Sequence, residues 1–223
     1  MIAPRNERLI AIGDIHGCLH ALNALLDAID PQPEDLIVTL GDYVDRGPNS
    51  AGVLDRLIRL SQQTRLVCLL GNHEEMMIDT YTQHRDERMW MRYGGIETMQ
   101  SYGTVYSTGW RPPTAHEKFL DALGEYFETD DFVFTHAAYE AELPMEDQSD
   151  YMLRWHSLNQ EVPERHCSGK PVVVGHTANP DGEILDLGHL ICIDTFCYGG
   201  GYLTAMDVRS RSIWQAAADG TMR

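Results

Sequence analysis

Five apolar runs in this chain each lead directly into residue types that bind divalent metals. The runs are RLIAIG, LIVTLG, RLVCLLG, FVFT and VVVG, and the residues that follow them are Asp14 with His16, Asp42, Asn72 with His73, His136 and His176. A short run rich in Val, Ile and Leu predicts a buried strand that ends at the following residue. In open α/β sheets, ligands bind at the carboxyl ends of the strands. We therefore predict that these side chains meet at one site.

The order of the expected elements predicts an α/β fold. In the first half, strands at 9–12, 36–41 and 65–71 alternate with helical patterns at 19–29, from Asn49 or Ser50 onward, and in the Met-rich stretch 76–91. This alternation is typical of βαβ units. A Gly-interrupted stretch from Tyr93 to Pro113 breaks the pattern, and Thr114 with Glu117 predicts a capping box that starts a helix through Leu123.

The second half predicts hairpins. YFET pairs with FVFT, EILDL with LICID, and YLTAMDV with SIWQA. Helices in the first half and hairpins in the second favour mixed sheets, and we expect two stacked sheets flanked by helices. A length of 223 residues without a dividing linker predicts one domain over residues 1–223.

Charge and cysteine content restrict the partners. Seventeen basic and thirty-four acidic residues give a formal net charge of −17, which disfavours nucleic acid and anionic membranes. The five cysteines are odd in number and form no C-x-x-C pair, which indicates reduced thiols. No apolar run approaches the length of a membrane span. We expect a cytoplasmic protein without a nucleic-acid or membrane partner.

The residue types at the strand ends indicate a metal site. Asp14 and His16 share a face if their segment stays extended, and carboxylate with imidazole suits iron, manganese or zinc. Asp42 opens GDYVDRG, where a carboxylate can bridge two ions and Arg46 offers a planar fork for phosphate oxygens. The simpler interpretations are a turn aspartate with an unrelated histidine, and a structural ion pair between Asp45 and Arg46.

The later motifs add an amide and imidazoles. Asn72 in GNHEE offers a neutral amide oxygen, while the adjacent His73 points elsewhere and is free for proton transfer. His136 and His176 can bind a second ion as neutral imidazoles. A single histidine at a strand end is more often a core or turn residue. Two of them beside the earlier motifs favour two metal sites with a shared bridge.

Two ions in such an arrangement support phosphoryl transfer. They activate a water and clamp the attacking and leaving oxygens of an in-line displacement. The chain has no G-x-S-x-G motif and no P-loop that would indicate another mechanism.

Together, GDIHG, GDYVDRG, GNHE, the isolated His136 and GHT at 175–177 resemble the metallophosphoesterase superfamily. More narrowly, they resemble PPP-type serine/threonine phosphatases of the small bacterial and bacteriophage-lambda type. The resemblance runs from about Leu9 to Val208. It implies the calcineurin-like fold and two divalent ions, manganese first, with iron or zinc as alternatives.

The resemblance also implies a role for each site residue. One ion would be held by Asp14, His16 and the bridging Asp42, and the other by Asp42, Asn72, His136 and His176. His73 would protonate the leaving alkoxide, oriented by Asp45, and Arg46 would bind phosphate. The family's second phosphate-binding arginine has no clear counterpart here. Arg154 in YMLRWHSL is ranked before Arg165.

Two further segments resemble parts of the family site. The stretch from Trp90 to Tyr102, with Gly94, Gly95, Thr98, Ser101 and Tyr102, is similar to the segment that covers the active site in small prokaryotic members. It can also be an ordinary helix end and loop. Tyr198, between Phe196 and Gly201, can take the part of a family tyrosine.

Three functions fit this pattern. The first is a metal-dependent phosphomonoesterase, a protein serine/threonine phosphatase with phosphoproteins or phosphopeptides as substrates and small phosphate esters as in vitro substrates. The second is a dinucleoside polyphosphate hydrolase of the diadenosine tetraphosphate type, whose members tend to be longer. The third is an inactive scaffold, which is disfavoured because every expected ligand and the proton donor are present.

Overall fold

The first half of the chain folds as alternating parallel strands and helices. The computed structural model describes residues 7–82, 87–104 and 109–223. Its first elements are β1 (Leu9–Ile12), α1 (Leu19–Ile29), β2 (Leu36–Thr39), α2 (Ser50–Leu60) and β3 (Arg65–Cys68). Asn49 caps α2, because its side chain accepts a hydrogen bond from the Gly52 N–H at 2.9 Å. The predicted strand and helix alternation is confirmed here.

The region after β3 is more helical than predicted. It contains α3 (Asn72–Thr82), α4 (Glu87–Trp90), the π-helical turn η1 (Met91–Gly95), α5 (Ile96–Ser101) and α6 (Thr114–Leu120). Part of the predicted Met-rich helix falls on 83–86, outside the described residues. The expected break is present one residue after Tyr93, because Gly94 has a non-helical φ of 113° and the chain kinks there before it continues into α5. The capping box is wrong: Pro113 is the N-cap, and Glu117 pairs with Arg111.

The second half consists of short strands joined by turns. The elements are β4 (Tyr126–Glu128), β5 (Val133–Thr135), η2 (Met145–Asp147), α7 (Asp150–Arg154), β6 (Val172–Val174), β7 (Leu185–Asp186), β8 (Leu190–Cys192), η3 (Cys197–Gly199), β9 (Leu203–Asp207) and β10 (Ile213–Ala216). The three predicted hairpins are present, because β4 with β5, β7 with β8, and β9 with β10 pair antiparallel.

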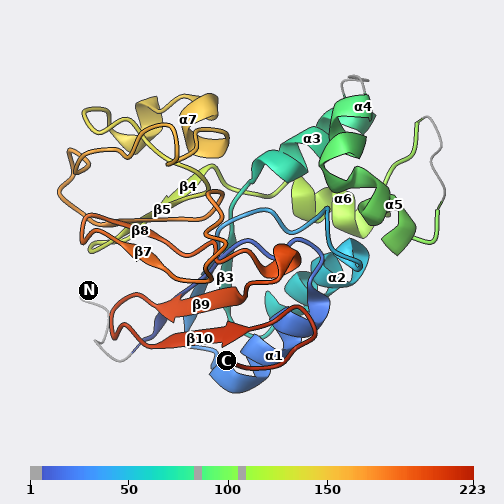
Figure 1. The fold of residues 1–223 in the computed structure, drawn as a ribbon, viewed down its shortest axis with the longest axis horizontal. Helices are drawn as coiled ribbons and strands as arrows, with labels where there is room; N and C mark the ends of the chain where they lie inside the picture. The colour runs from blue at the N-terminus through green and yellow to red at the C-terminus, as the bar shows by residue number, and fades with distance from the viewer. Residues whose placement is uncertain (1–6, 83–86, 105–108) are drawn as a thin grey trace.

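Two mixed sheets stack face to face (Figure 1). Their strand orders are β10-β9-β1-β2-β3 and β4-β5-β6-β8-β7. Successive side chains of β1 point to opposite faces of its sheet. Ile10 and Ile12 pack with α1 and α2 on one face, while Leu9 and Ala11 face the second sheet on the other. A third cluster, including Val172 and Leu153, lies between the second sheet and α7. The predicted mixed α/β architecture with two sheets flanked by helices is thus confirmed.

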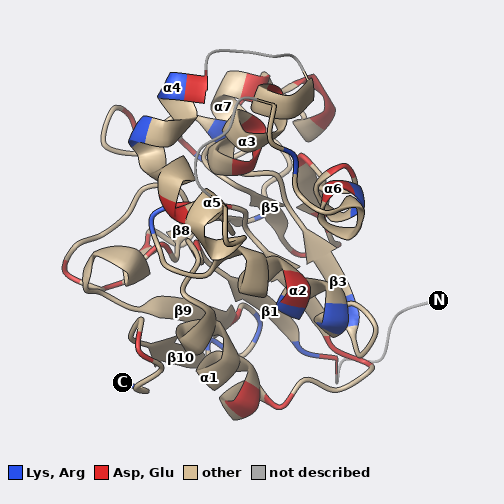
Figure 2. Cartoon of the chain, turned by 90° about the vertical axis from the view of Figure 1, so that its right-hand side faces the viewer, with Lys and Arg blue, Asp and Glu red and all other residues tan. Residues whose placement is uncertain are grey.

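The side of the molecule shown in Figure 2 carries charges of both signs. Figure 2 shows acidic and basic residues side by side on α2 and α4. No helix among the described residues is long and apolar enough to cross a membrane.

Candidate metal centre

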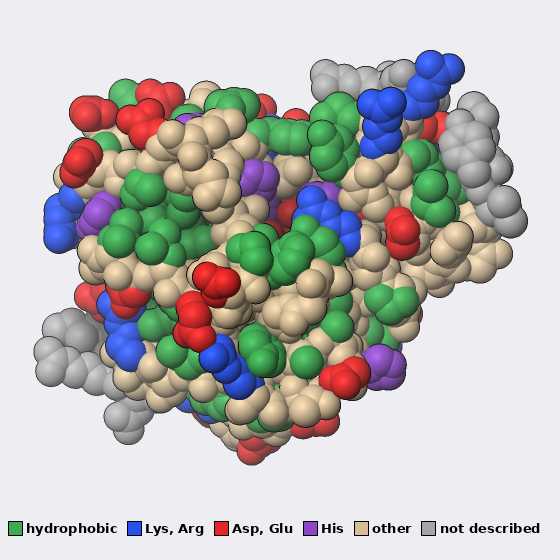
Figure 3. Space-filling view, viewed as in Figure 1, with side chains coloured by type: hydrophobic (Ala, Val, Ile, Leu, Met, Phe, Trp, Pro, Cys, Tyr) green, Lys and Arg blue, Asp and Glu red, His purple; other side chains and the backbone are tan. Residues whose placement is uncertain are grey.

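The predicted site residues come together where the strands of both sheets end. Several have left-handed backbone conformations, which non-glycine residues rarely adopt and which cluster at functional sites. The φ angles are 43° for His16, 49° for Asp42 and 61° for His176. Residues 14–16 therefore do not stay extended, and the condition under which Asp14 and His16 would share a strand face is not met. The chain turns at His16, and its N–H donates to the Asp42 carbonyl at 2.8 Å. On the molecular surface, histidine, acidic and basic side chains gather in a hollow of this face (Figure 3).

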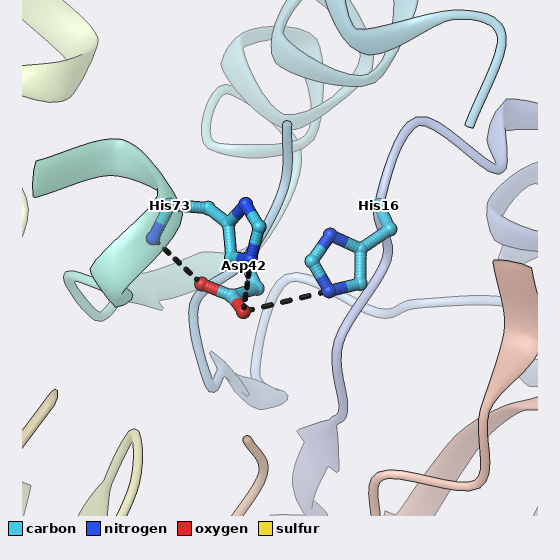
Figure 4. Close-up of side chains that lie close together, drawn as sticks. All are labelled: His16, Asp42 and His73. Atoms are coloured by element: carbon cyan, nitrogen blue, oxygen red, sulfur yellow. Dashed lines mark hydrogen bonds and ion pairs between the residues drawn. The ribbon is translucent and has the colours of Figure 1, made fainter. Parts of the chain in front are cut away.

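Asp42 lies between two groups of candidate ligands. Its Oδ2 is 3.4 Å from His16 Nε2, and its Oδ1 is 3.4 Å from His136 Nε2. His16, Asp42 and His73 form one group of potential ligand atoms (Figure 4). Asp42, His136 and His176 form the other. Burial raises the pKa of Asp42, but the surrounding histidines outweigh burial and hold that pKa well below its ordinary value. An ionised carboxylate with one oxygen toward each group fits a bridging position.

Backbone carbonyls fix the tautomers of the three predicted histidine ligands. His16 Nδ1 lies 2.9 Å from the Val44 carbonyl, His136 Nδ1 2.8 Å from that of Leu40, and His176 Nε2 3.2 Å from that of Trp155. Because a carbonyl only accepts, each of these nitrogens must carry the proton. The other ring nitrogen then presents a lone pair to the centre, as metal-binding histidines do.

The second group of donors converges around Asn72. Its Oδ1 lies 3.1 Å from His136 Nε2 and 3.1 Å from His176 Nδ1, and these two nitrogens are 3.2 Å apart. Burial lowers the pKa of His136, and burial together with His136 lowers the pKa of His176 to about 4. Neutral imidazoles and an amide oxygen, all aimed at one point, fit a divalent cation.

Asp14 lies beside a second buried carboxyl group that the sequence did not single out. The backbone N–H of His176 donates to both oxygens of Asp14, at 3.1 and 3.0 Å, and the buried carboxyl group of Asp194 lies close to Asp14. Burial raises the pKa of Asp14, and the charges of Asp194 and Asp42 raise it further. Gly175 makes this approach possible, because a Cβ there would lie 2.0 Å from Asp14 Oδ1. A cation would relieve the repulsion among these carboxylates.

His73 faces the centre from the start of α3. Its Nδ1 lies 2.7 Å from Asp45 Oδ2, so Nδ1–H donates to the carboxylate and Nε2 points toward Asp42, 3.9 Å from Oδ2. Burial alone would lower the pKa of His73, but the carboxylates of Asp42 and Asp45 raise it above its ordinary value. This raised pKa favours the protonated imidazolium, which suits a proton donor.

Glu74 is a buried residue that sequence analysis missed. Its carboxylate accepts backbone hydrogen bonds from Asp42 at 2.9 Å, Tyr43 at 2.8 Å, Val44 at 3.1 Å and Gly71 at 3.2 Å. It therefore fixes both the loop that carries Asp42 and the turn before Asn72. The only available signal was its position after Asn72 and His73, where adjacent Glu74 and Glu75 also fit a helix N-terminus.

The two predicted phosphate-binding arginines lie in different surroundings. Arg46 Nη1 is 2.9 Å from His16 Nε2, and its guanidinium lies over the Tyr198 ring, 4.5 Å from the ring centroid. The hydrogen-bond and ion-pair partners of Arg154 in the described structure are Glu75, Glu125 and Asp150. Arg46 therefore contacts the centre, whereas Arg154 is held by carboxylates. Its phosphate-binding role stays a prediction.

A two-sheet α/β fold with carboxylate, imidazole and amide donors at its strand ends fits a metal-dependent enzyme. Comparison with known families narrows this class, because the model of the calcineurin-like phosphoesterase family matches residues 7–202. The chain belongs to the calcineurin-like phosphoesterase family. The family predicted from the motifs is therefore confirmed.

The chain is similar in sequence to proteins of two kinds. Serine/threonine-protein phosphatase 1 of Salmonella typhimurium is 38% identical over 97 residues, and this match covers 42% of each chain. An asymmetrical bis(5'-nucleosyl)-tetraphosphatase of Anoxybacillus flavithermus is 29% identical, covering 87% of this chain and 88% of the relative. A crystal structure of a putative diadenosine tetraphosphatase has a TM-score of 0.69 at 23% identity, covering 95% of this chain and 94% of that chain. This last likeness concerns the fold.

Proposed function

We propose that this chain is a metal-dependent phosphomonoesterase that acts on phosphoserine and phosphothreonine in proteins. The observation that carries the proposal is the arrangement around Asp42, whose two oxygens face separate donor groups at 3.4 Å each. Asp14, His16 and Asp42 would hold one divalent ion, and Asp42, Asn72, His136 and His176 the other. These oxygen and nitrogen donors accept manganese, iron or zinc, and the resemblance to PPP-type phosphatases puts manganese first.

Each remaining site residue has a task in the proposed reaction. When bound, the two cations supply an activated water and neutralise charge on the phosphate. Arg46 binds phosphate oxygens with its guanidinium, and the Tyr198 ring beneath it limits its movement. His73 donates its Nε2 proton to the leaving oxygen of the serine or threonine. Asp45 keeps the His73 ring in the orientation this transfer requires.

The surroundings of the two arginines favour a substrate with one phosphate. Arg46 contacts the centre directly, while the guanidinium of Arg154 is surrounded by three carboxylates. The chain also carries a formal net charge of −17, which disfavours a polyanion at long range. A phosphorylated side chain brings less negative charge into this site than a dinucleoside tetraphosphate does.

A dinucleoside polyphosphate hydrolase is the second candidate. It is favoured by the likeness to the Anoxybacillus tetraphosphatase, which extends over 88% of that relative. Arg88 and Arg92 also line a surface cavity with Tyr93, whose ring centroid lies 6.4 Å from that of His73. Distal phosphates of a longer substrate would reach toward this surface.

A direct substrate comparison separates the two candidates. We expect kcat/KM for a phosphothreonine peptide to exceed that for diadenosine tetraphosphate by at least about tenfold, since a phosphomonoesterase stabilises the transition state of the monoester preferentially. Phosphate release and nucleotide products are measured with the same manganese-loaded preparation. Turnover of the dinucleotide alone would establish the second candidate and exclude the first.

A further inference from the structure

Side chains distant in sequence surround the buried carboxylate of Asp45. Trp90 Nε1 lies 2.9 Å from Oδ1 and 3.0 Å from Oδ2, and Thr98 Oγ1 lies 2.7 Å from Oδ1. The remaining partner, His73 Nδ1, lies 2.7 Å from Oδ2. An ionised carboxylate only accepts hydrogen bonds, so all three groups donate to it. Together they fix the plane of the carboxylate and the direction in which it faces His73.

The Thr98 hydroxyl has only one consistent hydrogen-bonding pattern. It accepts the backbone N–H of Asp45 at 2.8 Å and lies 2.9 Å from Ser50 Oγ. Because its single proton is donated to Asp45 Oδ1, the Ser50 hydroxyl must be the donor in their contact. Thr98 thus holds both the backbone and the side chain of Asp45. Such a fully satisfied buried network has little freedom to rearrange.

The same segment also packs closely on the loop that carries Asp45 and Arg46. The Gly94 carbonyl accepts the Arg46 N–H at 3.4 Å, and a Cβ on Gly94 would lie 2.3 Å from that nitrogen. A Cβ on Gly95 would lie 2.6 Å from the Trp90 ring. These contacts are made by η1, where the chain kinks at Gly94, φ 113°. The segment from Trp90 to Thr98 is therefore shaped to hold this loop.

We propose that Trp90 and Thr98 are positioning residues for protonation of the leaving group. They hold Asp45, Asp45 orients His73, and His73 delivers the proton. This role rests on the proposed phosphomonoesterase function, and it predicts that the importance of both residues depends on the leaving group of the substrate. A serine or threonine alkoxide leaves poorly without a proton, whereas 4-nitrophenolate leaves well without one. Trp90 and Thr98 should therefore matter most for alkyl phosphates and other esters with poor leaving groups.

Trp90→Phe and Thr98→Val test this role, because each removes a donor and largely preserves side-chain shape. We measure kcat and KM for 4-nitrophenyl phosphate, phenyl phosphate and a phosphothreonine peptide. Each variant is expected to lower kcat for phenyl phosphate and the peptide about tenfold, and for 4-nitrophenyl phosphate less than about threefold, with KM unchanged, because only the acid's alignment is lost. Manganese content, measured by elemental analysis, should equal that of the unaltered protein.

Two comparisons separate positioning from a general structural role. Trp214→Phe in β10 is the matched tryptophan control, and Ser101→Ala is the hydroxyl control on α5, because its Oγ contacts the Thr98 carbonyl rather than Asp45. Both should leave the ratio of the two aryl phosphate rates unchanged. In a His73→Asn background, Trp90→Phe and Thr98→Val should have no further effect, since the proton donor is already absent.

Equal decreases in kcat on all three substrates would overturn the positioning role. So would effects of Trp90→Phe or Thr98→Val that add fully to that of His73→Asn. If Trp90→Phe does not fold, as judged by circular dichroism, Thr98→Val decides by the same criteria. An unaltered protein that is loaded with manganese and inactive on every ester would instead remove the proposed function itself.

Discussion

Replacement of His73 by Asn is expected to lower phosphoester turnover by at least about 10²-fold, as is typical for loss of a general acid. Asn has no proton to donate at neutral pH, so the leaving alkoxide departs unprotonated. The bound metal should remain, because the predicted ligands are other residues. Steady-state kinetics with a phosphothreonine peptide and elemental analysis of the same sample measure both effects.

The control for this variant is His20→Asn, which alters an exposed histidine on α1. It should retain full activity. A His73→Asn protein with unchanged turnover would exclude His73 from the mechanism. Loss of one metal ion in this variant would instead make His73 a ligand, which its membership in the first donor group also allows.

Replacement of Asp42 by Asn is expected to abolish activity and to weaken metal binding. In the unaltered chain, Asp42 Oδ2 lies 3.4 Å from His16 Nε2 and Oδ1 lies 3.4 Å from His136 Nε2. An asparagine side chain has one oxygen, so it cannot present an oxygen to both histidines. Supporting residues around metal ligands already contribute 10–100-fold to affinity, so loss of the bridging ligand should cost at least about 10²-fold. Manganese titration followed by calorimetry measures the change.

The matched control is Asp27→Asn, at an exposed position of α1. It removes the same charge from the chain and should leave manganese affinity unchanged. An Asp42→Asn protein that binds metal as tightly as the unaltered chain would show that Asp42 does not join the two donor groups.

The strand ends were predictable because the local signal is strong. Each apolar run forces burial, and the following Asp, Asn or His has no role in the core, so Asp42 and His136 could be assigned to one site from sequence alone. The two stacked sheets followed from the order of helices and hairpins. The positions of these elements therefore needed no long-range information.

The supporting residues were not predictable for the opposite reason. Glu74 and Thr98 act on loops 32 and 53 residues away in sequence, through contacts that only the folded chain creates. The resemblance placed Thr98 in the segment that covers the site but did not indicate its contact with Asp45. Asp194 likewise meets Asp14 from a distant loop. The turn at His16 was missed because spacing alone assumed an extended backbone, whereas His16 adopts φ 43°. Tertiary packing decides each of these features.

Chain length does not distinguish the two candidate functions. Length favoured a protein phosphatase because dinucleoside polyphosphate hydrolases tend to be longer. The Anoxybacillus tetraphosphatase is nevertheless matched over 88% of its length by 87% of this chain. The surroundings of Arg46 and Arg154 therefore remain the reason to favour a phosphoprotein substrate. Comparison of the phosphothreonine peptide with diadenosine tetraphosphate tests this choice.

The stoichiometry of metal binding tests the central claim most directly. Chelator-treated protein is titrated with manganese, and bound ions per chain are measured together with hydrolysis of 4-nitrophenyl phosphate. The two donor groups around Asp42 predict two ions per chain, with activity that appears as the second ion binds. A protein that binds one ion or none at saturating manganese would contradict a dinuclear centre, whether that protein is fully active or inactive.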